Sequence, residues 1–126
     1  MSRLFVYGDL LQGRPLDGVL APFRRRPARV RGRLVRLPGG GPGLVPDEAE
    51  AAGEVAGELV DLPESFLSVV DLMLGVREGE LERVRLSVAG RRGSLTAWTH
   101  VVPPATARYL APLRVRDWRR APTRGR

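Results

Sequence analysis

Glycine and proline divide the chain into short segments, and this division constrains the fold more than any other feature. The 126 residues include 15 glycines and 11 prolines, with alternating apolar and polar positions between them. A strand follows such a period of two, whereas a helix needs a period near 3.6. A clear helical period occurs only between Pro63 and Gly75. The pattern predicts one α+β domain built mainly from short strands.

The strand predictions rest on this alternation. An apolar run is stopped by Gly8, and a second segment places Arg29, Arg31 and Arg33 on one face. The expected strands are Arg3–Tyr7, Arg29–Leu37, Glu54–Leu62, Leu81–Val88, Ser94–Val102 and a closing Val115–Trp118, the fourth and fifth forming a hairpin. Residues 38–46 hold a triple glycine and three prolines, so we expect an irregular loop there.

The helix prediction rests on capping signals and on an apolar stripe. Asp61 is a candidate N-cap with Glu64 three residues on, Pro63 falls in the first turn, and Gly75 is a natural stop. The predicted inward stripe is Phe66, Val69, Val70, Met73 and Leu74. Short helices are also expected within Gly13–Phe23 and Ala107–Leu110.

Composition excludes several kinds of site. The chain has no cysteine and a single histidine, His100, so thiolate chemistry and multi-histidine metal centres are excluded. Packing is the expected role of His100. The sequence shows no secretory hydrophobic region and no apolar run of about 18 residues. We therefore expect a cytoplasmic protein with no metal site and no membrane partner.

Arginine alone carries the positive charge. All 21 basic residues are arginine, against 14 acids, which gives a formal net charge of +7. Runs such as Arg24–Arg26 could follow phosphate groups. However, aromatic residues make up only 6% of the chain and no RNA-binding or helix-turn-helix signature occurs. Lysine, asparagine and isoleucine are all absent and share A/T-rich codons, so a GC-rich genome explains the arginines. These features argue against a nucleic-acid partner.

A series of short motifs lies in order along residues 3–102. They are Leu4–Gly13, Val30–Leu34, Pro42–Pro46, Val55–Leu59, Val70–Val76, Arg83–Val88 and Ala97–Val101. Together they resemble the γ-glutamylcyclotransferase-like (AIG2-like) family, whose opening strand leads into a Tyr-Gly-x-Leu loop. The resemblance implies a small mixed β-barrel, or curled sheet, with flanking short helices and a ligand cavity at one end.

The resemblance also implies a reaction and a substrate-binding loop. In this family the substrate's α-amine attacks its own γ-carbonyl, which releases an amine and 5-oxoproline without a metal or cofactor. The matching loop positions are Tyr7, Gly8, Asp9 and Leu10. A glycine turn there lets backbone N–H groups approach a carboxylate or an oxyanion. Asp9 replaces a usual serine or threonine and would disfavour an anionic substrate if it faced the cavity.

Leu74 lies where the family places its catalytic glutamate, and Leu81 lies where many members have a tyrosine. An alkyl side chain can neither accept nor donate a proton, so the family's classical mechanism is expected to be lost. Two carboxylates just beyond the helix, Glu78 and Glu80, are the candidate substitutes. Arg83 is retained.

The resemblance implies a γ-glutamylcyclotransferase-like domain with a small-molecule pocket of γ-glutamyl type, formed by Tyr7–Leu10 and Leu74. If active, it would release 5-oxoproline. The alternative function is a non-enzymatic module that binds a protein or a polyanion through its arginine-rich surface. We expect the domain to span residues 1–118, with an Arg/Pro-rich tail over 119–126. The sequence predicts no oligomeric state.

Overall fold

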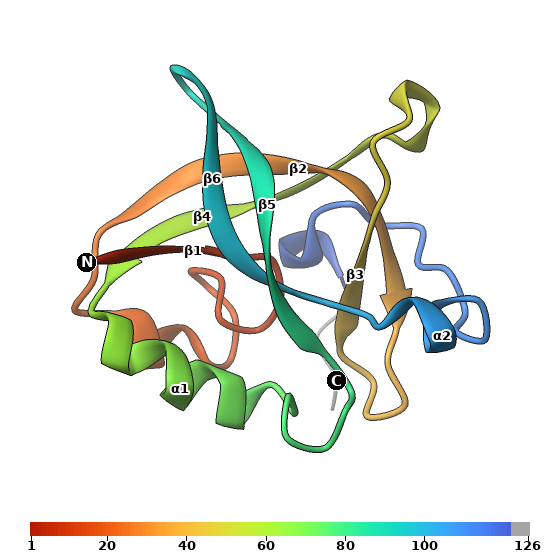
Figure 1. Ribbon diagram of the computed structural model, residues 1–126, viewed down its shortest axis with the longest axis horizontal. Coiled ribbons are helices and arrows are strands. Elements are labelled where there is room, and N and C mark those ends of the chain that lie inside the picture. Colours follow the sequence, from red (N-terminus) through yellow and green to blue (C-terminus); the bar gives the residue numbers. More distant parts are fainter. Residues whose placement is uncertain (122–126) are drawn as a thin grey trace.

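Six strands and two short α-helices form the fold in the computed structural model, which describes residues 1–121 apart from the side chain of Glu50 (Figure 1). The strands are β1 (Ser2–Val6), β2 (Arg25–Arg36), β3 (Pro42–Pro46), β4 (Glu54–Leu62), β5 (Glu82–Gly90) and β6 (Gly93–Val101). The helices are α1 (Glu64–Met73) and α2 (Pro104–Ala107), with 3₁₀ turns η1 (Asp17–Leu20), η2 (Glu50–Ala52) and η3 (Trp118–Arg120).

The sheet closes on itself as a mixed β-barrel. Strand β4 pairs antiparallel with β1 and β2, and β5 pairs antiparallel with β6. Two further pairings complete the ring, a parallel one between β1 and β6 at Leu4 and Trp98 and an antiparallel one between β2 and β5 at Arg29 and Ala89. Strand β3 is an extra strand between β2 and β6. The predicted α+β fold with a small mixed barrel is therefore confirmed.

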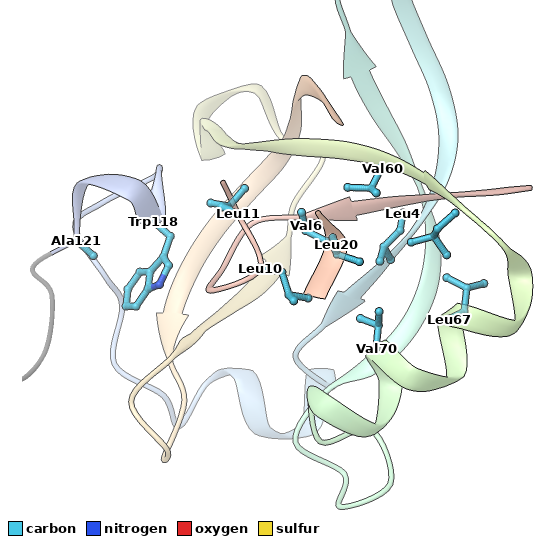
Figure 2. Packing of buried hydrophobic residues seen from close by; sticks show 11 residues of the cluster. Leu4, Val6, Leu10, Leu11, Leu20, Val60, Leu67, Val70, Trp118 and Ala121 are labelled. Atoms are coloured by element: carbon cyan, nitrogen blue, oxygen red, sulfur yellow. The ribbon is translucent and has the colours of Figure 1, made fainter. Parts of the chain in front are cut away.

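Strands β1 and β4 carry buried residues on both faces. Phe5 and Leu59 belong to the cluster inside the barrel, whereas Leu4 and Val60 belong to a second cluster outside it. The outer cluster lies beneath α1, where Leu67 and Val70 are directed toward the strands (Figure 2). Each of these two strands thus carries apolar residues in succession.

The irregular loop expected over residues 38–46 is partly wrong, because Pro42–Pro46 forms β3. Its two prolines pair with the ends of a β2 segment, as Arg36↔Pro42 and Gly32↔Pro46. Proline is tolerated at strand ends because the interior residues still supply N–H donors. Only the glycine turn before Pro42 remains a loop.

The helix exists but begins later than predicted. Its first residue is Glu64, and the residue before it, Pro63, makes no side-chain cap. Asp61 belongs to β4 and pairs with Arg26 at 3.0 Å, so the predicted capping box is wrong. The inward face is centred on Leu67 and Val70, whereas the predicted members Val69 and Met73 are 43% and 39% exposed.

The C-terminal part contains no strand at Val115–Trp118, contrary to the prediction. Residues 111–116 instead run beside β2 and β4, with an isolated bridge between Val35 and Pro112 and a hydrogen bond from Ala56 N to Arg116 O. The η3 turn follows, with buried Trp118, and residues 122–126 of the expected tail lie outside the described residues. No helix in the described part is long and apolar enough to cross a membrane.

Candidate functional site

A cavity of about 210 Å³ opens where the ends of β1 and β6 meet the beginnings of β3 and β5. Its apolar wall includes Phe5, Leu16, Leu37, Met73 and Leu81. The polar groups come from the loop after β1, from the segment after α1 and from β6. The cavity brings together Tyr7, Gly8, Asp9, Leu10, Leu74 and Glu80, six of the seven residues singled out for the pocket from the sequence.

Tyr7 fixes the start of the loop. Its hydroxyl donates a hydrogen bond to His100 O at 2.7 Å and accepts one from Leu44 N at 3.0 Å. Burial strongly raises the pKa of this hydroxyl, so it stays protonated. The next residue, Gly8, lies against Pro42, where an added Cβ would be 3.2 Å from Pro42 Cγ. The loop therefore passes close to β3 at a position suited to glycine.

Three successive N–H groups in this loop are available to a ligand. In the part of the chain that the structure describes, the N–H groups of Gly8, Asp9 and Leu10 donate no hydrogen bond. The following N–H groups are occupied: Leu11 donates to Gly8 O, and Gln12 donates to Glu58 Oε1. Consecutive unpaired backbone donors beside a cavity suit a carboxylate or a developing oxyanion.

Asp9 lines the cavity, but its carboxylate contacts two residues that do not belong to the cavity wall. Oδ1 accepts a hydrogen bond of 2.7 Å from Trp118 Nε1, and Arg14 Nε lies 4.0 Å away. The guanidinium of Arg14 also lies over the Trp118 ring. An N–H donor and a nearby cation reduce the repulsion that Asp9 exerts on an anionic ligand.

The two candidate carboxylates lie in different places. Glu80 lines the cavity and Glu78 does not. Gly75 ends α1 with φ +76°, and a Cβ added there would come within 2.5 Å of Glu80 Oε2. Glu80 N also donates to Gly75 O at 3.1 Å, so the chain folds back on itself. The carboxylate of Glu80 thus lies beside the residue that follows Leu74 and on the same cavity wall.

A histidine on the cavity wall was predicted only to pack. His100 is buried, and its Nε2 lies 2.8 Å from Asp71 Oδ1. Both oxygens of Asp71 also accept from Arg83 Nε, at 2.9 and 3.0 Å. Burial lowers the pKa of His100, an effect that the hydrogen bond and charge of Asp71 oppose. No local sequence signal groups these three residues, which come from α1, β5 and β6.

A largely buried ion pair between Arg25 and Glu58 also holds the loop, and the sequence analysis did not identify it. Arg25 donates to Glu58 Oε1 at 2.8 Å, and the same nitrogen donates to Leu10 O at 2.8 Å. Its other terminal nitrogen donates to Asp17 O. Arg25 therefore fastens the loop and η1 to β4, although in the sequence it is one member of an arginine run.

Comparison with known proteins identifies the family and the fold. Residues 4–120 match the profile of the family described as "Gamma-glutamyl cyclotransferase, AIG2-like". A comparison with curated protein sequences found no match. The chain is similar to the crystal structure of YkqA from Bacillus subtilis, with 24% identity and a TM-score of 0.72 over 93% of this chain. It spans only 39% of YkqA.

Two further solved structures share the fold. An AIG2-like protein from Mus musculus is 21% identical with a TM-score of 0.71, over 90% of this chain and 86% of the mouse chain. A structure described as a γ-glutamyl cyclotransferase is 20% identical with a TM-score of 0.66, over 81% of this chain and 66% of its own. Since the family profile spans almost the whole described chain, this protein belongs to the γ-glutamyl cyclotransferase, AIG2-like family.

Proposed function

We propose that the cavity binds a γ-glutamyl compound and that Glu80 supplies the carboxylate that Leu74 cannot. One observation carries this proposal: Glu80 lies on the cavity wall together with the loop Tyr7–Leu10. The family relationship supports the ligand class, and the three available N–H groups of the loop support binding of its carboxylate or oxyanion.

The reaction follows from the chemistry of such a ligand. The α-amine attacks the γ-carbonyl, a C–N bond closes the five-membered ring, and the C–N bond to the leaving amine breaks. A proton leaves the attacking amine and reaches the leaving amine, and Glu80 is the group that accepts and returns it. The N–H groups of Gly8, Asp9 and Leu10 stabilise the negative oxygen that forms meanwhile. The products are 5-oxoproline and a free amine.

Incubation with a panel of γ-glutamyl amino acids and γ-glutamylamines, followed by detection of 5-oxoproline, tests this proposal. We expect Glu80→Gln to reduce turnover by about 10²-fold or more, the usual contribution of a positioned acid or base. Glu78→Gln is the matched control, since Glu78 is exposed on the same segment but does not line the cavity. Its turnover should equal that of the wild type.

Two results would count against this assignment. Equal loss in Glu78→Gln and Glu80→Gln would show a general charge effect and not a role in the cavity. No product from the wild type, together with a thermal shift on adding γ-glutamyl compounds, would show binding without cyclisation. In that case Leu74→Glu tests the scaffold, because a gain of 5-oxoproline would show that only the carboxylate was missing.

A further inference from the structure

A second hollow, of about 590 Å³, lies at the other end of the β5–β6 hairpin and shares no residue with the cavity. It is formed by the start of β2 and by the hairpin tip, which extends past β2 (Figure 1). We call it the arginine hollow. Its lining residues are Arg24, Arg25, Arg26, Pro27, Leu59, Gly90, Arg91, Arg92, Gly93, Ser94 and Leu95. Five of the eleven are arginines and none is acidic.

Three of these arginines have no carboxylate partner among the side chains that the structure describes. Arg25 is paired with Glu58 at 2.8 Å, and Arg26 with Asp61 at 3.0 Å. Arg24, Arg91 and Arg92 are exposed and form no ion pair or side-chain hydrogen bond in the described part. Like charges gathered around one hollow repel each other, and a bound anion relieves this repulsion.

The hairpin turn itself does not require arginine. Gly93 has φ +123° and takes the unusual backbone conformation, whereas Arg91 and Arg92 have ordinary negative φ values. Positions of this kind in a turn accept most residue types. The two arginines therefore contribute charge to the hollow without serving the local geometry. Ser94, at the beginning of β6, adds a hydroxyl donor.

The positive region is small. The neighbouring hollow along β2 shares Ser94 but is lined by Glu48 and Glu54. On the other side, Asp61 lies next to Arg26 and lines a separate hollow with Arg3. A long polyanion would meet carboxylates in both directions. A compact ligand with several charges matches the arginine hollow better, and the planar forked guanidinium suits phosphate oxygens.

We propose that the arginine hollow binds a small compound with a diphosphate or triphosphate group, held by Arg24, Arg91 and Arg92. The hollow has the size of an ordinary ligand site. The hollow shares no lining residue with the cavity, so the proposal goes beyond the proposed function and does not rest on it.

Calorimetric titration of the full chain with inorganic pyrophosphate, at about 50 and 200 mM salt, tests the proposal. We expect one saturable site, weaker at the higher salt concentration. The double variant Arg91→Gln/Arg92→Gln should lose about tenfold or more in affinity, because two charge-assisted contacts disappear. The matched control is Arg33→Gln/Arg77→Gln, which removes the same charge from two exposed positions outside the hollow. Its affinity should stay within about twofold of the wild type.

Three results would overturn the proposal. The wild type could fail to bind pyrophosphate. The two double variants could lose affinity equally, which would show only an effect of net charge. Finally, a single-stranded RNA of about 12 nucleotides could bind while excess pyrophosphate failed to displace it, which would assign the surface to a nucleic-acid strand. Circular dichroism and the unfolding midpoint of each variant confirm that the fold is intact.

Discussion

At the scale of single residues, His100 shows how the cavity wall is held together. Its side chain is 1% exposed, the residue belongs to the cavity wall, and Nε2 contacts Asp71. Arg83 neutralises Asp71 from the other side, and the guanidinium of Arg83 lies 4.5 Å from the ring centroid of Trp98. Burial lowers the pKa of His100, so the ring is neutral near pH 7, and because a carboxylate accepts, Nε2 is the nitrogen that carries the hydrogen and donates it to Asp71. The carboxylate of Asp71 on α1 thus connects this helix to Arg83 on β5 and His100 on β6.

The buried position of His100 gives stability a pH dependence. Its pKa in the folded protein is below the ordinary value of 6.5, chiefly because burial disfavours the charged ring. As pH falls through 6.5 the unfolded chain takes up the proton first, so stability falls until the folded-state pKa is reached. The free energy of unfolding should therefore rise with pH across this window, by at most about 1.4 kcal/mol per pH unit.

NMR measures this pKa directly, because the chain has a single histidine. The imidazole resonance should titrate below pH 6.5 in the wild type. Asp71→Asn removes the charge that favours the protonated ring, so the pKa of His100 should fall further. A wild-type value at or above 6.5, or a rise in Asp71→Asn, would contradict the assigned network.

At the scale of elements, the end of α1 and the loop after it place Glu80. Gly75 and Gly79 both have positive φ, +76° and +79°. A Cβ on Gly75 would meet Glu80, whereas a Cβ on Gly79 has nothing within 4 Å. A side chain at either position bears the cost of the positive φ, but only a side chain at Gly75 also meets Glu80. Comparing the two positions therefore separates these two costs.

Alanine substitutions at these glycines provide a matched pair. Gly79→Ala should lower the free energy of unfolding by about 1 kcal/mol through backbone strain alone. Gly75→Ala should lose more, about 2 kcal/mol, because Glu80 must also move. Urea denaturation measures both. Equal losses would show that the carboxylate of Glu80 does not lie against Gly75 in solution.

The sequence predicted those elements whose signal is local. The bounds of β4 were correct, and those of β1 were correct to one residue, because alternation and stop residues mark them. Strand β3 was missed because the prolines that suggest a loop occupy only its ends. The buried face of α1 differs from the predicted one because the helix has more apolar residues than one stripe needs. Val69, Leu72, Met73 and Leu74 allow more than one stripe. Packing on β1 selects the stripe centred on Leu67 and Val70.

The candidate site likewise divides into a part with a local sequence signal and a part that depends on contacts distant in the sequence. Tyr7–Leu10 is a continuous motif, and the family resemblance singled it out. Asp71 and His100 are 29 positions apart, and Arg25 and Glu58 are 33 apart, so these pairs become visible only once the barrel closes. The structure, unlike the sequence, also distinguishes Glu80 from Glu78.

At the scale of the whole molecule, residues 111–118 form a strap that runs beside β2 and β4. Leu113 N donates to Leu34 O, and Arg116 Nη1 reaches Ala52 O at 2.6 Å. The strap ends at Trp118, which belongs to the same cluster as Leu10 and Leu11 (Figure 2). Its Nε1 donates to Asp9 Oδ1 at 2.7 Å. The last described part of the chain therefore supports the first loop, and the cavity depends on both ends of the domain.

Substitution of Trp118 tests this dependence. Trp118→Phe keeps an aromatic ring in the cluster but removes the N–H donor to Asp9, so the free energy of unfolding should fall by about 1–3 kcal/mol. Trp118→Ala should cost about 3–5 kcal/mol through the lost volume. Hydrogen exchange at the amides of Asp9 and Leu10 should become faster in Trp118→Phe than global unfolding explains, since the loop loses its anchor.

The matched control is Trp98→Phe, because Trp98 packs against the same outer cluster but donates no hydrogen bond to the loop within the described residues. Trp98 is half-buried between Arg83 and Arg85, and phenylalanine keeps a ring for these cations to stack on. Exchange at Asp9 and Leu10 should be unchanged in this variant. If both variants accelerated exchange equally, the effect would come from general destabilisation. Faster exchange in Trp118→Phe alone would show that the strap holds the loop Tyr7–Leu10 in place.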